Sequence, residues 1–382
     1  MTRRDASRPR VTAVIPAHNM ESFLERAIMS AVRQTYPELD IIVVNDGSTD
    51  ATRAIAERIA ATHECMRVET IANAGVAAAR NLGTELARSA YVAYLDGDDL
   101  WHPEKIEKQV AALAAHGHDS AWAACYALSR YVDVNDRVLG NGPLVEARGD
   151  FLEKHLYRNH IGNGSCLMVR REAALEVGGF DPGYAKRGIG GLEDYEFQLK
   201  LLRRYRIDLV GEFLVGYRVR KGQMSDDQGR MSRARIATVE AILADCELPE
   251  TTRREVLAHA RVVAAYREAL AGDLLRAAAT FGRSLVESPR LTWRWIVELA
   301  SIRAGQWRTA GRSGPTGHGG EFAPPPSFND LDPRDGAGAE GEVSVQPRAR
   351  IEAFRERPAG QPPAEGAPVD RSTADRSARS AR

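Results

Sequence analysis

Short apolar runs alternate with longer segments of helical periodicity over the first hundred residues. Four runs are apolar enough to be buried strands: Val11–Ile15, Ile41–Val44, Val68–Ile71 and Tyr91–Leu95. The segments between them repeat apolar side chains every three to four positions, as amphipathic helices do: Glu21–Gln34, Ala51–Ala61 and Val76–Arg88. Because strands that alternate with helices usually pair in parallel, we predict an α/β fold with a mainly parallel central sheet.

Polar or glycine-containing stretches follow all four predicted strands. They are Pro16-Ala17-His18-Asn19, Asn45-Asp46-Gly47-Ser48, Ala72-Asn73-Ala74-Gly75 and Asp96-Gly97-Asp98-Asp99. In a parallel sheet, ligands bind at the carboxyl ends of the strands. We therefore expect the four stretches to converge on one binding site.

The pattern changes twice further along the chain. Strand-like and helical pieces alternate less regularly from about Ala121 to Gln223, and the pattern is helical from about Ser232 to Trp307. Ten of the 18 prolines and none of the five tryptophans lie beyond Ala310, so this stretch buries too little apolar surface to offset its ordering entropy. We predict a flexible N-terminus (1–10), an α/β domain (11–228), a helical extension (229–309) and a disordered tail rich in Pro, Gly and Ala (310–382).

Composition excludes some partners. Lys and Arg number 52, as do Asp and Glu, so the overall charge gives no reason to expect nucleic acid as a partner. Four dispersed cysteines without CxxC spacing indicate reduced thiols rather than a zinc site or disulfides. The apolar run Val11–Pro16 is shorter than a signal-peptide core, and no apolar stretch reaches membrane-spanning length. We expect a cytoplasmic protein.

The stretch Asp96-Gly97-Asp98-Asp99 carries the most distinctive chemistry. Carboxylates this crowded repel one another, and burying them unpaired is costly. A divalent cation relieves that repulsion, and hard oxygen ligands suit Mg²⁺ or Mn²⁺. The alternative is an acidic turn that caps the helix following Pro103, and this stretch by itself leaves both interpretations open.

Several ordered motifs together resemble the family 2 glycosyltransferases of GT-A fold. The motifs are Val14-Ile15-Pro16-Ala17-His18-Asn19, Val43-Val44-Asn45-Asp46-Gly47-Ser48-Thr49-Asp50, Gly75-Val76-Ala77-Ala78-Ala79-Arg80-Asn81 and Asp96-Gly97-Asp98-Asp99. The resemblance covers roughly Val11 to Ser225. It implies an inverting enzyme that moves one sugar from a nucleotide-diphosphate sugar to a hydroxyl of a glycan, lipid-linked or protein acceptor, with Mn²⁺ or Mg²⁺ as cofactor.

The resemblance also implies roles for single residues. The nucleotide sugar would be bound by Pro16, His18, Asn19, Asp46, Gly75, Arg80, Asp96 and Asp98. Asp46 would accept a hydrogen bond from the base imide, which favours a UDP- or dTDP-linked donor, although family members commonly have Asp where this chain has Asn45. Arg80 would reach a phosphate. The structural alternatives are a turn with a helix cap at Asp46 and an exposed helix arginine at position 80.

The metal, by the same resemblance, would be held by Asp99 and Asp98, and would bridge the two phosphates. The division of roles between Asp96 and Asp98 stays open. Arg218 and Arg220 are candidates for a phosphate contact. Many relatives have His at the position of Arg220, so we expect no direct metal ligand there.

The catalytic base implied by the resemblance is Asp194, in a Glu-Asp pair that opens a helix after a glycine-rich loop. The helix dipole would keep this carboxylate ionised. The alternative is that Glu193 and Asp194 only cap and charge the helix. Glu193, Gly179 and Phe180 would lie on the acceptor or donor-sugar side, and Asn163-Gly164-Ser165 on the acceptor side.

Three roles stay open for the helices from Ser232 to Trp307: completing the acceptor cleft, forming a homodimer face, or docking to a membrane-associated partner. Weak contact with the membrane itself is suggested by Trp293, Trp295, Ile296 and Leu299 beside Arg290, Arg294 and Arg303. The chain lacks the Gln-x-x-Arg-Trp motif of processive relatives. Two other functions remain: a non-catalytic nucleotide-sugar or glycan-binding protein, and a nucleotidyltransferase, which usually has a glycine- and lysine/arginine-rich loop after its first strand.

Overall fold

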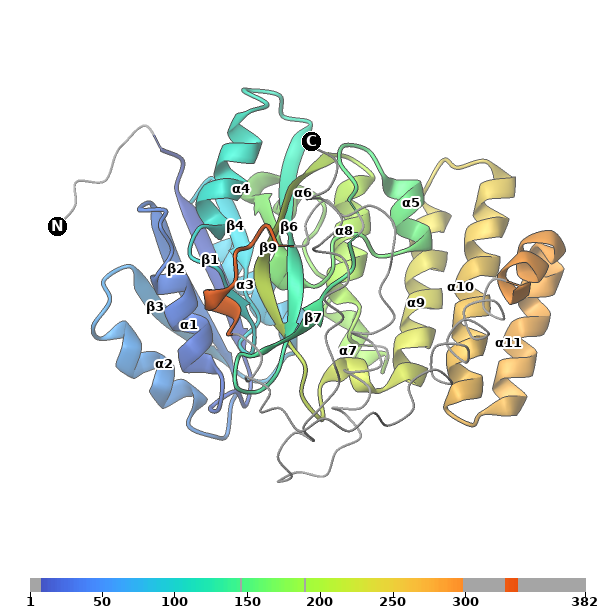
Figure 1. Ribbon diagram of the computed structural model, residues 1–382, viewed down its shortest axis with the longest axis horizontal. Coiled ribbons are helices and arrows are strands. Elements are labelled where there is room, and N and C mark those ends of the chain that lie inside the picture. Colours follow the sequence, from blue (N-terminus) through green and yellow to red (C-terminus); the bar gives the residue numbers. More distant parts are fainter. Residues whose placement is uncertain (1–7, 145, 189, 298–326, 336–382) are drawn as a thin grey trace, which may run out of the picture.

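A nine-stranded mixed sheet forms the centre of the protein, in the computed structural model that describes residues 8–144, 146–188, 190–297 and 327–335 (Figure 1). The strands are β1 (Val11–Ala17), β2 (Leu39–Asp46), β3 (Met66–Ile71), β4 (Tyr91–Tyr94), β5 (Leu100–Trp101), β6 (Trp122–Val132), β7 (Val138–Asn141), β8 (Leu167–Arg170) and β9 (Arg206–Arg218). Their order is β3-β2-β1-β4-β8-β6-β9-β5, with β7 paired to β6. The half β3-β2-β1-β4 is parallel, as predicted.

The second half of the sheet mixes directions. Strand β8 is antiparallel to β4 and β6, β9 is parallel to β6, and β5 is antiparallel to β9. Because β4 adjoins β8 directly, the acidic loop that leaves β4 lies at the boundary between the two halves. Residues from both halves can therefore reach it.

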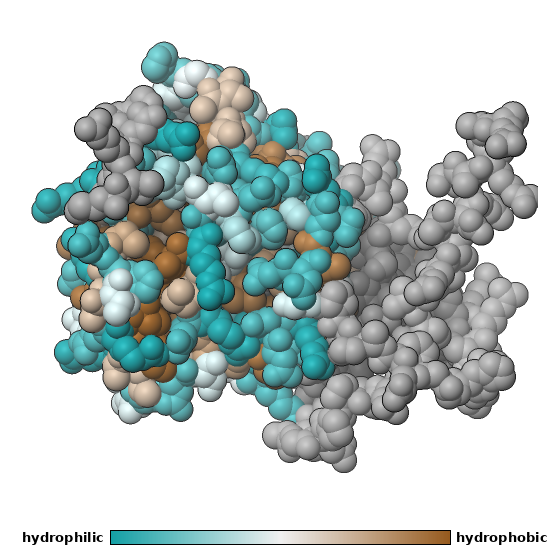
Figure 2. Space-filling view, turned by 60° about the vertical axis from the view of Figure 1, so that its left-hand side comes forward, coloured by the Kyte–Doolittle hydropathy of each residue, from teal (hydrophilic) through white to brown (hydrophobic). Residues whose placement is uncertain are grey.

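The described helices lie around and beyond this sheet. They are α1 (Leu24–Val32), α2 (Thr52–Ala60), α3 (Val76–Leu86), α4 (Lys105–Ala114), α5 (Leu152–Tyr157), α6 (Arg171–Glu176), α7 (Gly183–Lys186), α8 (Glu193–Leu202), α9 (Gln228–Ala244), α10 (Glu250–Leu270) and α11 (Leu274–Glu287), with a further helical stretch over 289–297. The end of the molecule that carries α1, α2 and β3 has a mainly hydrophilic surface with hydrophobic side chains between (Figure 2). None of the described helices is long and apolar enough to cross a bilayer.

Close packing holds α3 against the sheet. All seven residues of β1 are buried. At Gly83 of α3, an added Cβ would lie 2.3 Å from Cγ1 of Val14, so only glycine allows the helix to approach the strand this closely. This fixes the helix that carries Arg80 relative to the ends of the parallel strands.

The helical extension packs on α8. Helices α9, α10 and α11 lie side by side beyond the sheet (Figure 1). Tyr195 and Leu199 of α8 share a hydrophobic cluster with Val239, Ile242 and Val256 of the extension. The extension thus supports the helix whose first turn contains Asp194. Leu299 and Arg303 of the predicted membrane-contact stripe lie outside the described residues.

A short segment of the tail packs back on the sheet. Phe328 is 1% exposed and shares a cluster with Leu100 and Val132. The backbone N–H of Phe213 donates to the carbonyl of Pro333 at 2.7 Å. Residues 327–335 are therefore ordered against the sheet although they fall within the stretch predicted to be disordered; most of that stretch lies outside the described residues.

Candidate active site

The ends of β1, β2 and β3 meet through Asp46. Its carboxylate accepts the backbone N–H of Ala74 at 2.7 Å and that of Gly75 at 2.9 Å. A carboxylate accepts a hydrogen bond from a backbone N–H more strongly than a neutral oxygen does. Here it fixes the loop that precedes α3. The predicted convergence of Asp46 and Gly75 is therefore present, with Asp46 acting on the loop backbone.

The loop after β1 lies against the same point. Nδ1–H of His18 donates to the carbonyl of Asp46 at 2.7 Å, and the Asn73 amide lies 3.2 Å from Nε2 of the same ring. Asn19 is exposed and has a positive φ of 53°, and its Oδ1 accepts the N–H of Thr49. Pro16 is buried within β1. His18 and Asn19 thus form a polar rim at the strand ends.

Arg80 is buried between the two halves of the site. Its guanidinium donates to the carboxylate of Asp96 and lies over the ring of Phe180, with Cζ 5.1 Å from the ring centroid. A Cβ at Gly164 would lie 2.9 Å from Nη2 of Arg80, so the guanidinium packs closely against Gly164. Arg80 is therefore 4% exposed, and the alternative of an exposed helix arginine does not hold.

Asp99 is enclosed by hydrogen-bond donors. Its Oδ2 accepts the Asn163 amide and, at 2.7 Å, the hydroxyl of Ser165; its Oδ1 accepts the backbone N–H of Arg218 at 2.9 Å. Burial, followed by the charges of Asp98 and Asp96, raises the pKa of Asp99 well above its usual range. At 1% exposure with both oxygens engaged, Asp99 has the contacts of a residue that holds the loop in shape.

Asp98 is paired with Arg220. Nε of Arg220 donates to Oδ2 of Asp98 at 2.8 Å, and the Asp98 side chain keeps 17% exposure. Burial raises the pKa of Asp98; the Arg220 charge opposes this and the Asp96 charge adds to it. Asp98 is thus the less enclosed of the two neighbouring carboxylates, Asp98 and Asp99.

Asp194 stands in the first turn of α8 and is partly buried. Its Oδ1 accepts the backbone N–H of Tyr195 at 2.7 Å. Burial raises the pKa of Asp194 to about 7; Arg80 opposes the shift, and Asp96 and Glu193 add to it. These interactions bring Asp194, Arg80 and Asp96 together, although they come from three separate predicted motifs.

The remaining predicted residues, Glu193, Phe180 and Gly179, make contacts within the protein that support this arrangement. Glu193 is buried, and its Oε2 accepts the N–H of Gly191 at 2.7 Å. Phe180 is 1% exposed and stacks on Phe197 with centroids 4.2 Å apart. The carbonyl of Gly179 accepts Nζ of Lys200 at 3.1 Å. Phe180 therefore supports Arg80 rather than presenting its ring to a ligand.

The sequence matches a known family. Residues 12–178 match the sequence model of the family described as glycosyl transferase family 2. A glycosyltransferase of Haemophilus influenzae is 32% identical over 232 residues, which are 57% of this chain and 68% of the relative. The chain belongs to glycosyl transferase family 2. The predicted family resemblance and enzyme class are thereby confirmed.

Other similarities are more partial. Chondroitin synthase of Pasteurella multocida is 31% identical over 134 residues, but these are 14% of that enzyme. The structure of S. aureus TarS 1–349 has a TM-score of 0.54 at 16% identity and covers 74% of this chain and 82% of TarS. Mannosyltransferase PcManGT from Pyrobaculum calidifontis, in complex with GDP-Man and Mn²⁺, has a TM-score of 0.53 at 21% identity and covers 79% and 83%. These likenesses confirm the predicted GT-A fold.

Sequence reasoning gave some residues of the candidate site a different role and missed others. Asn163 and Ser165, expected on the acceptor side, hold Asp99. Asp136, which was not singled out, accepts the fully buried guanidinium of Arg218. Asn163 and Ser165 sit in a polar, glycine-containing stretch before β8, which is a signal for a strand-end loop. No local pattern identifies Asp136, because its partner lies 82 positions away in the chain.

The acidic loop has the donor atoms for a hard cation. Mg²⁺ typically takes one or two carboxylates together with substrate phosphate oxygens. Asp96 and Asp98 lie on one loop, and Asp96 helps to raise the pKa of Asp98, so a cation would relieve their repulsion. Asp96 and Asp98 therefore fit a Mg²⁺ or Mn²⁺ ion. Over the described ranges, no group of three or more His, Cys, Asp or Glu side chains is placed to hold a metal ion.

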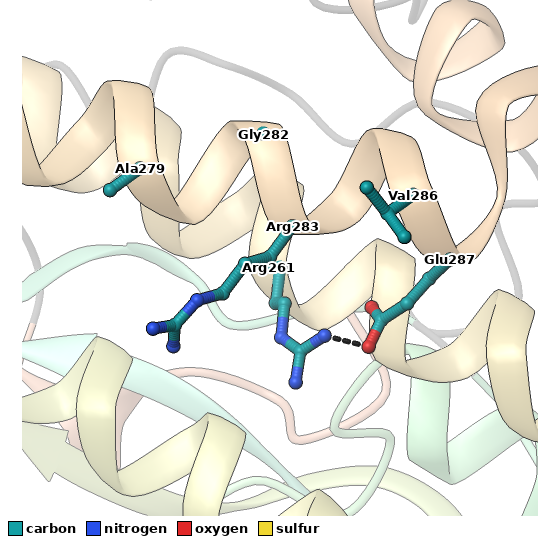
Figure 3. Close-up of a pocket in the computed structure, with 6 residues that line it drawn as sticks. All are labelled: Arg261, Ala279, Gly282, Arg283, Val286 and Glu287. Atoms are coloured by element: carbon teal, nitrogen blue, oxygen red, sulfur yellow. Dashed lines mark ion pairs between the residues drawn. The ribbon is translucent and has the colours of Figure 1, made fainter.

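A separate hollow of about 390 Å³ lies between α10 and α11. Figure 3 shows the Arg261 and Arg283 side chains next to each other in it, with Arg261 paired to Glu287. These helices lie at the far end of the molecule from β1, β2 and β3 (Figure 1). The hollow is therefore not part of the strand-end site.

Proposed function

We propose that this glycosyltransferase moves a single sugar from a nucleotide-diphosphate sugar to an acceptor hydroxyl, with inversion at the anomeric carbon. The observation that carries the proposal is the proximity of the partly buried Asp194 to the Arg80–Asp96 pair at the strand ends. A carboxylate with a pKa of about 7 suits a general base, because it is ionised in part at neutral pH and still accepts a proton readily.

Asp194 would take the proton of the acceptor hydroxyl as its oxygen attacks. The N–H of Tyr195, 2.7 Å from Oδ1, favours the ionised form, and the start of α8 adds a favourable dipole. Attack from the face opposite the departing nucleoside diphosphate inverts the anomeric carbon. Arg80 lowers the pKa of Asp194, so its charge keeps the base available.

The nucleoside would lie at the ends of β1 to β3. His18 and Asn19 form the polar rim there, while Asp46 shapes the loop through Ala74 and Gly75. We keep a UDP- or dTDP-linked donor as the proposal. One structural relative, TarS, is described in complex with UDP-GlcNAc, whereas PcManGT is described with GDP-Man, so the donor base is open to direct test.

A divalent cation, Mn²⁺ or Mg²⁺, would be held by Asp98 with Asp96 beside it. When bound, such an ion neutralises negative charge on the departing diphosphate. Asp99, predicted as a ligand, would act by fixing the loop, because its two oxygens are already engaged.

The acceptor would be a glycan, a lipid-linked sugar or a protein, in polysaccharide or related biosynthesis in the cytoplasm. Relatives named chondroitin synthase and hyaluronan synthase favour the polysaccharide class. Homodimer formation and weak contact with the inner face of the membrane remain proposals for the helical extension.

Asp194→Asn tests the proposal directly. Removing the base should lower sugar transfer by a factor of about 10² to 10⁴, while nucleotide-sugar binding stays unchanged. Nucleotide sugars are first screened by thermal shift, and transfer is then measured with the product's anomeric configuration. Asp150→Asn, an exposed carboxylate, is the matched control.

Unchanged transfer by Asp194→Asn would exclude this base, and a retained configuration would exclude inversion. Donor binding without transfer or donor hydrolysis by the unmodified protein, across all donors, would favour the non-catalytic alternative.

A further inference from the structure

Two arginines at the end of β9 have different environments. The Arg218 side chain is fully buried and donates to three oxygens, namely the carbonyls of Asp98 and Asp133 and the carboxylate of Asp136. Arg220 keeps 23% exposure and binds one oxygen, Oδ2 of Asp98. Each of the three guanidinium nitrogens of Arg218 therefore has an oxygen partner, whereas only Nε of Arg220 has one in the described part of the chain.

The two Nη groups of Arg220 lie between two parts of the site. Nη2 of Arg220 donates to the sulfur of Met20 at 3.7 Å, and Met20 follows the His18–Asn19 rim. Nε of Arg220 donates to Asp98 of the acidic loop. Among the described residues, neither Nη1 nor Nη2 has an oxygen partner. A guanidinium has five N–H groups, and planar pairs of them match phosphate oxygens.

Two of the carboxylates in the acidic loop are already paired with arginines. The acidic loop carries three carboxylates, and Arg80 pairs with Asp96 while Arg220 pairs with Asp98. A divalent cation bound to Asp98 would take the carboxylate that Arg220 already neutralises. The guanidinium and a divalent cation would therefore each neutralise the negative charge of Asp98.

We propose that Arg220 is a resident cation of the donor site, which neutralises Asp98 in the free enzyme and binds the donor diphosphate. This rests on the proposed function, since it places the diphosphate beside the acidic loop. Two consequences follow. The nucleoside diphosphate binds to this enzyme after divalent metal is removed, and metal competes with Arg220 for Asp98.

Calorimetry with UDP, dTDP and GDP tests the first consequence, using the full chain with Mn²⁺ or with EDTA. For the unmodified enzyme, EDTA should weaken the best-bound nucleotide by less than about threefold. In Arg220→Gln, EDTA should weaken it by about tenfold to 100-fold, the range of a lost charged hydrogen bond to phosphate, and Mn²⁺ should restore it. Arg220→Lys should be intermediate. Lys221→Gln, an exposed neighbour with the same charge change, should behave like the unmodified enzyme.

Mn²⁺ binding without nucleotide, followed by electron paramagnetic resonance, tests the second consequence. Arg220→Gln should bind Mn²⁺ more tightly than the unmodified enzyme, because Asp98 loses its partner. Melting curves verify that the variants fold, and Arg220→Lys replaces Arg220→Gln if the latter does not.

Three results would overturn the proposal: EDTA weakens binding to the unmodified enzyme as much as to the variant, Arg220→Gln is indistinguishable from the unmodified enzyme, or its affinity for Mn²⁺ is unchanged. Absence of binding by every nucleotide in either condition would overturn the proposed function and this inference with it. Metal-dependent binding by the unmodified enzyme would overturn the inference alone.

Discussion

The acidic loop and the start of α8 each contain an aspartate with a raised pKa, but the surroundings of the two carboxyl groups differ. Burial raises the pKa of Asp99 in the loop and of Asp194 in the helix. Asp99, however, has both oxygens bound by donors and is 1% exposed, whereas the Asp194 side chain accepts one neighbouring N–H and is partly exposed. A raised pKa alone therefore does not mark a base; the carboxylate must also reach an incoming hydroxyl.

In the proposed mechanism, the acidic loop keeps the site in shape and Asp194 takes up the proton. Arg80 couples them, because it pairs with Asp96 of the loop and lowers the pKa of Asp194. Substitutions in the loop should therefore affect stability first. Changes around Asp194 should affect the rate and its pH dependence.

Asp99→Ala should give the largest effect on stability. It leaves the Asn163 amide, the Ser165 hydroxyl and the Arg218 N–H without their acceptor inside the protein. Each unsatisfied buried donor costs roughly 1–3 kcal/mol, so we expect the free energy of unfolding to fall by about 3 kcal/mol or more in urea titrations. Glu64→Ala, at an exposed turn, is the control. An unchanged unfolding midpoint together with a loss of Mn²⁺ binding would instead make Asp99 a metal ligand.

The pH dependence of transfer should follow Asp194. Since the base must be ionised, kcat/KM should fall about tenfold per pH unit below its pKa of about 7 and level off above it. Glu193→Gln keeps an acceptor for Gly191 and removes a charge that raises this pKa, so the profile should move to lower pH. Initial rates between about pH 5 and 9 measure both. A flat profile, or one unmoved by Glu193→Gln, would contradict the assignment.

The raised pKa of Asp194 should also make the stability of the protein depend on pH. Between the ordinary value of 3.8 and about 7, the folded state holds a proton on Asp194 that the unfolded state has released. The contribution of Asp194 to the free energy of unfolding should therefore fall as the pH rises through this window. In Asp194→Asn this contribution is absent, so the variant should be more stable than the unmodified enzyme at pH 8, which urea titration at pH 5 and 8 measures.

The parallel half of the fold was predictable because its signals are local. The runs at Val11–Ile15 and Ile41–Val44 lie within observed strands, and the polar strand ends met as expected. The two-residue β5 was missed, because Leu100 and Trp101 form no recognisable run of their own. Antiparallel pairing of β8 with β4 and β6 depends on long-range contacts that periodicity does not encode.

The site was predictable by residue type but less well by role. Asp46, Arg80, Asp98 and Asp194 all lie at the strand-end site or its border. Their partners decide what each does, and those partners are distant in sequence: Arg220 is 122 positions from Asp98. Phe180 shows the limit most clearly, since a glycine-flanked aromatic residue resembles a ligand platform but is buried against Phe197.

The smallest expected effect concerns residues 327–335, which pack on Leu100, the residue that follows the acidic loop. The Phe328 N–H donates to the carbonyl of Asp136, and the Asp136 carboxylate holds Arg218. In Phe328→Ala, this segment should detach locally, so the global free energy of unfolding should change by less than about 1 kcal/mol. Hydrogen exchange at the Phe213 N–H, which donates to Pro333, should become faster, whereas Asn329→Ala at an exposed position should leave it unchanged. A loss of stability as large as that of Asp99→Ala would show instead that the segment belongs to the same cooperative core as the loop.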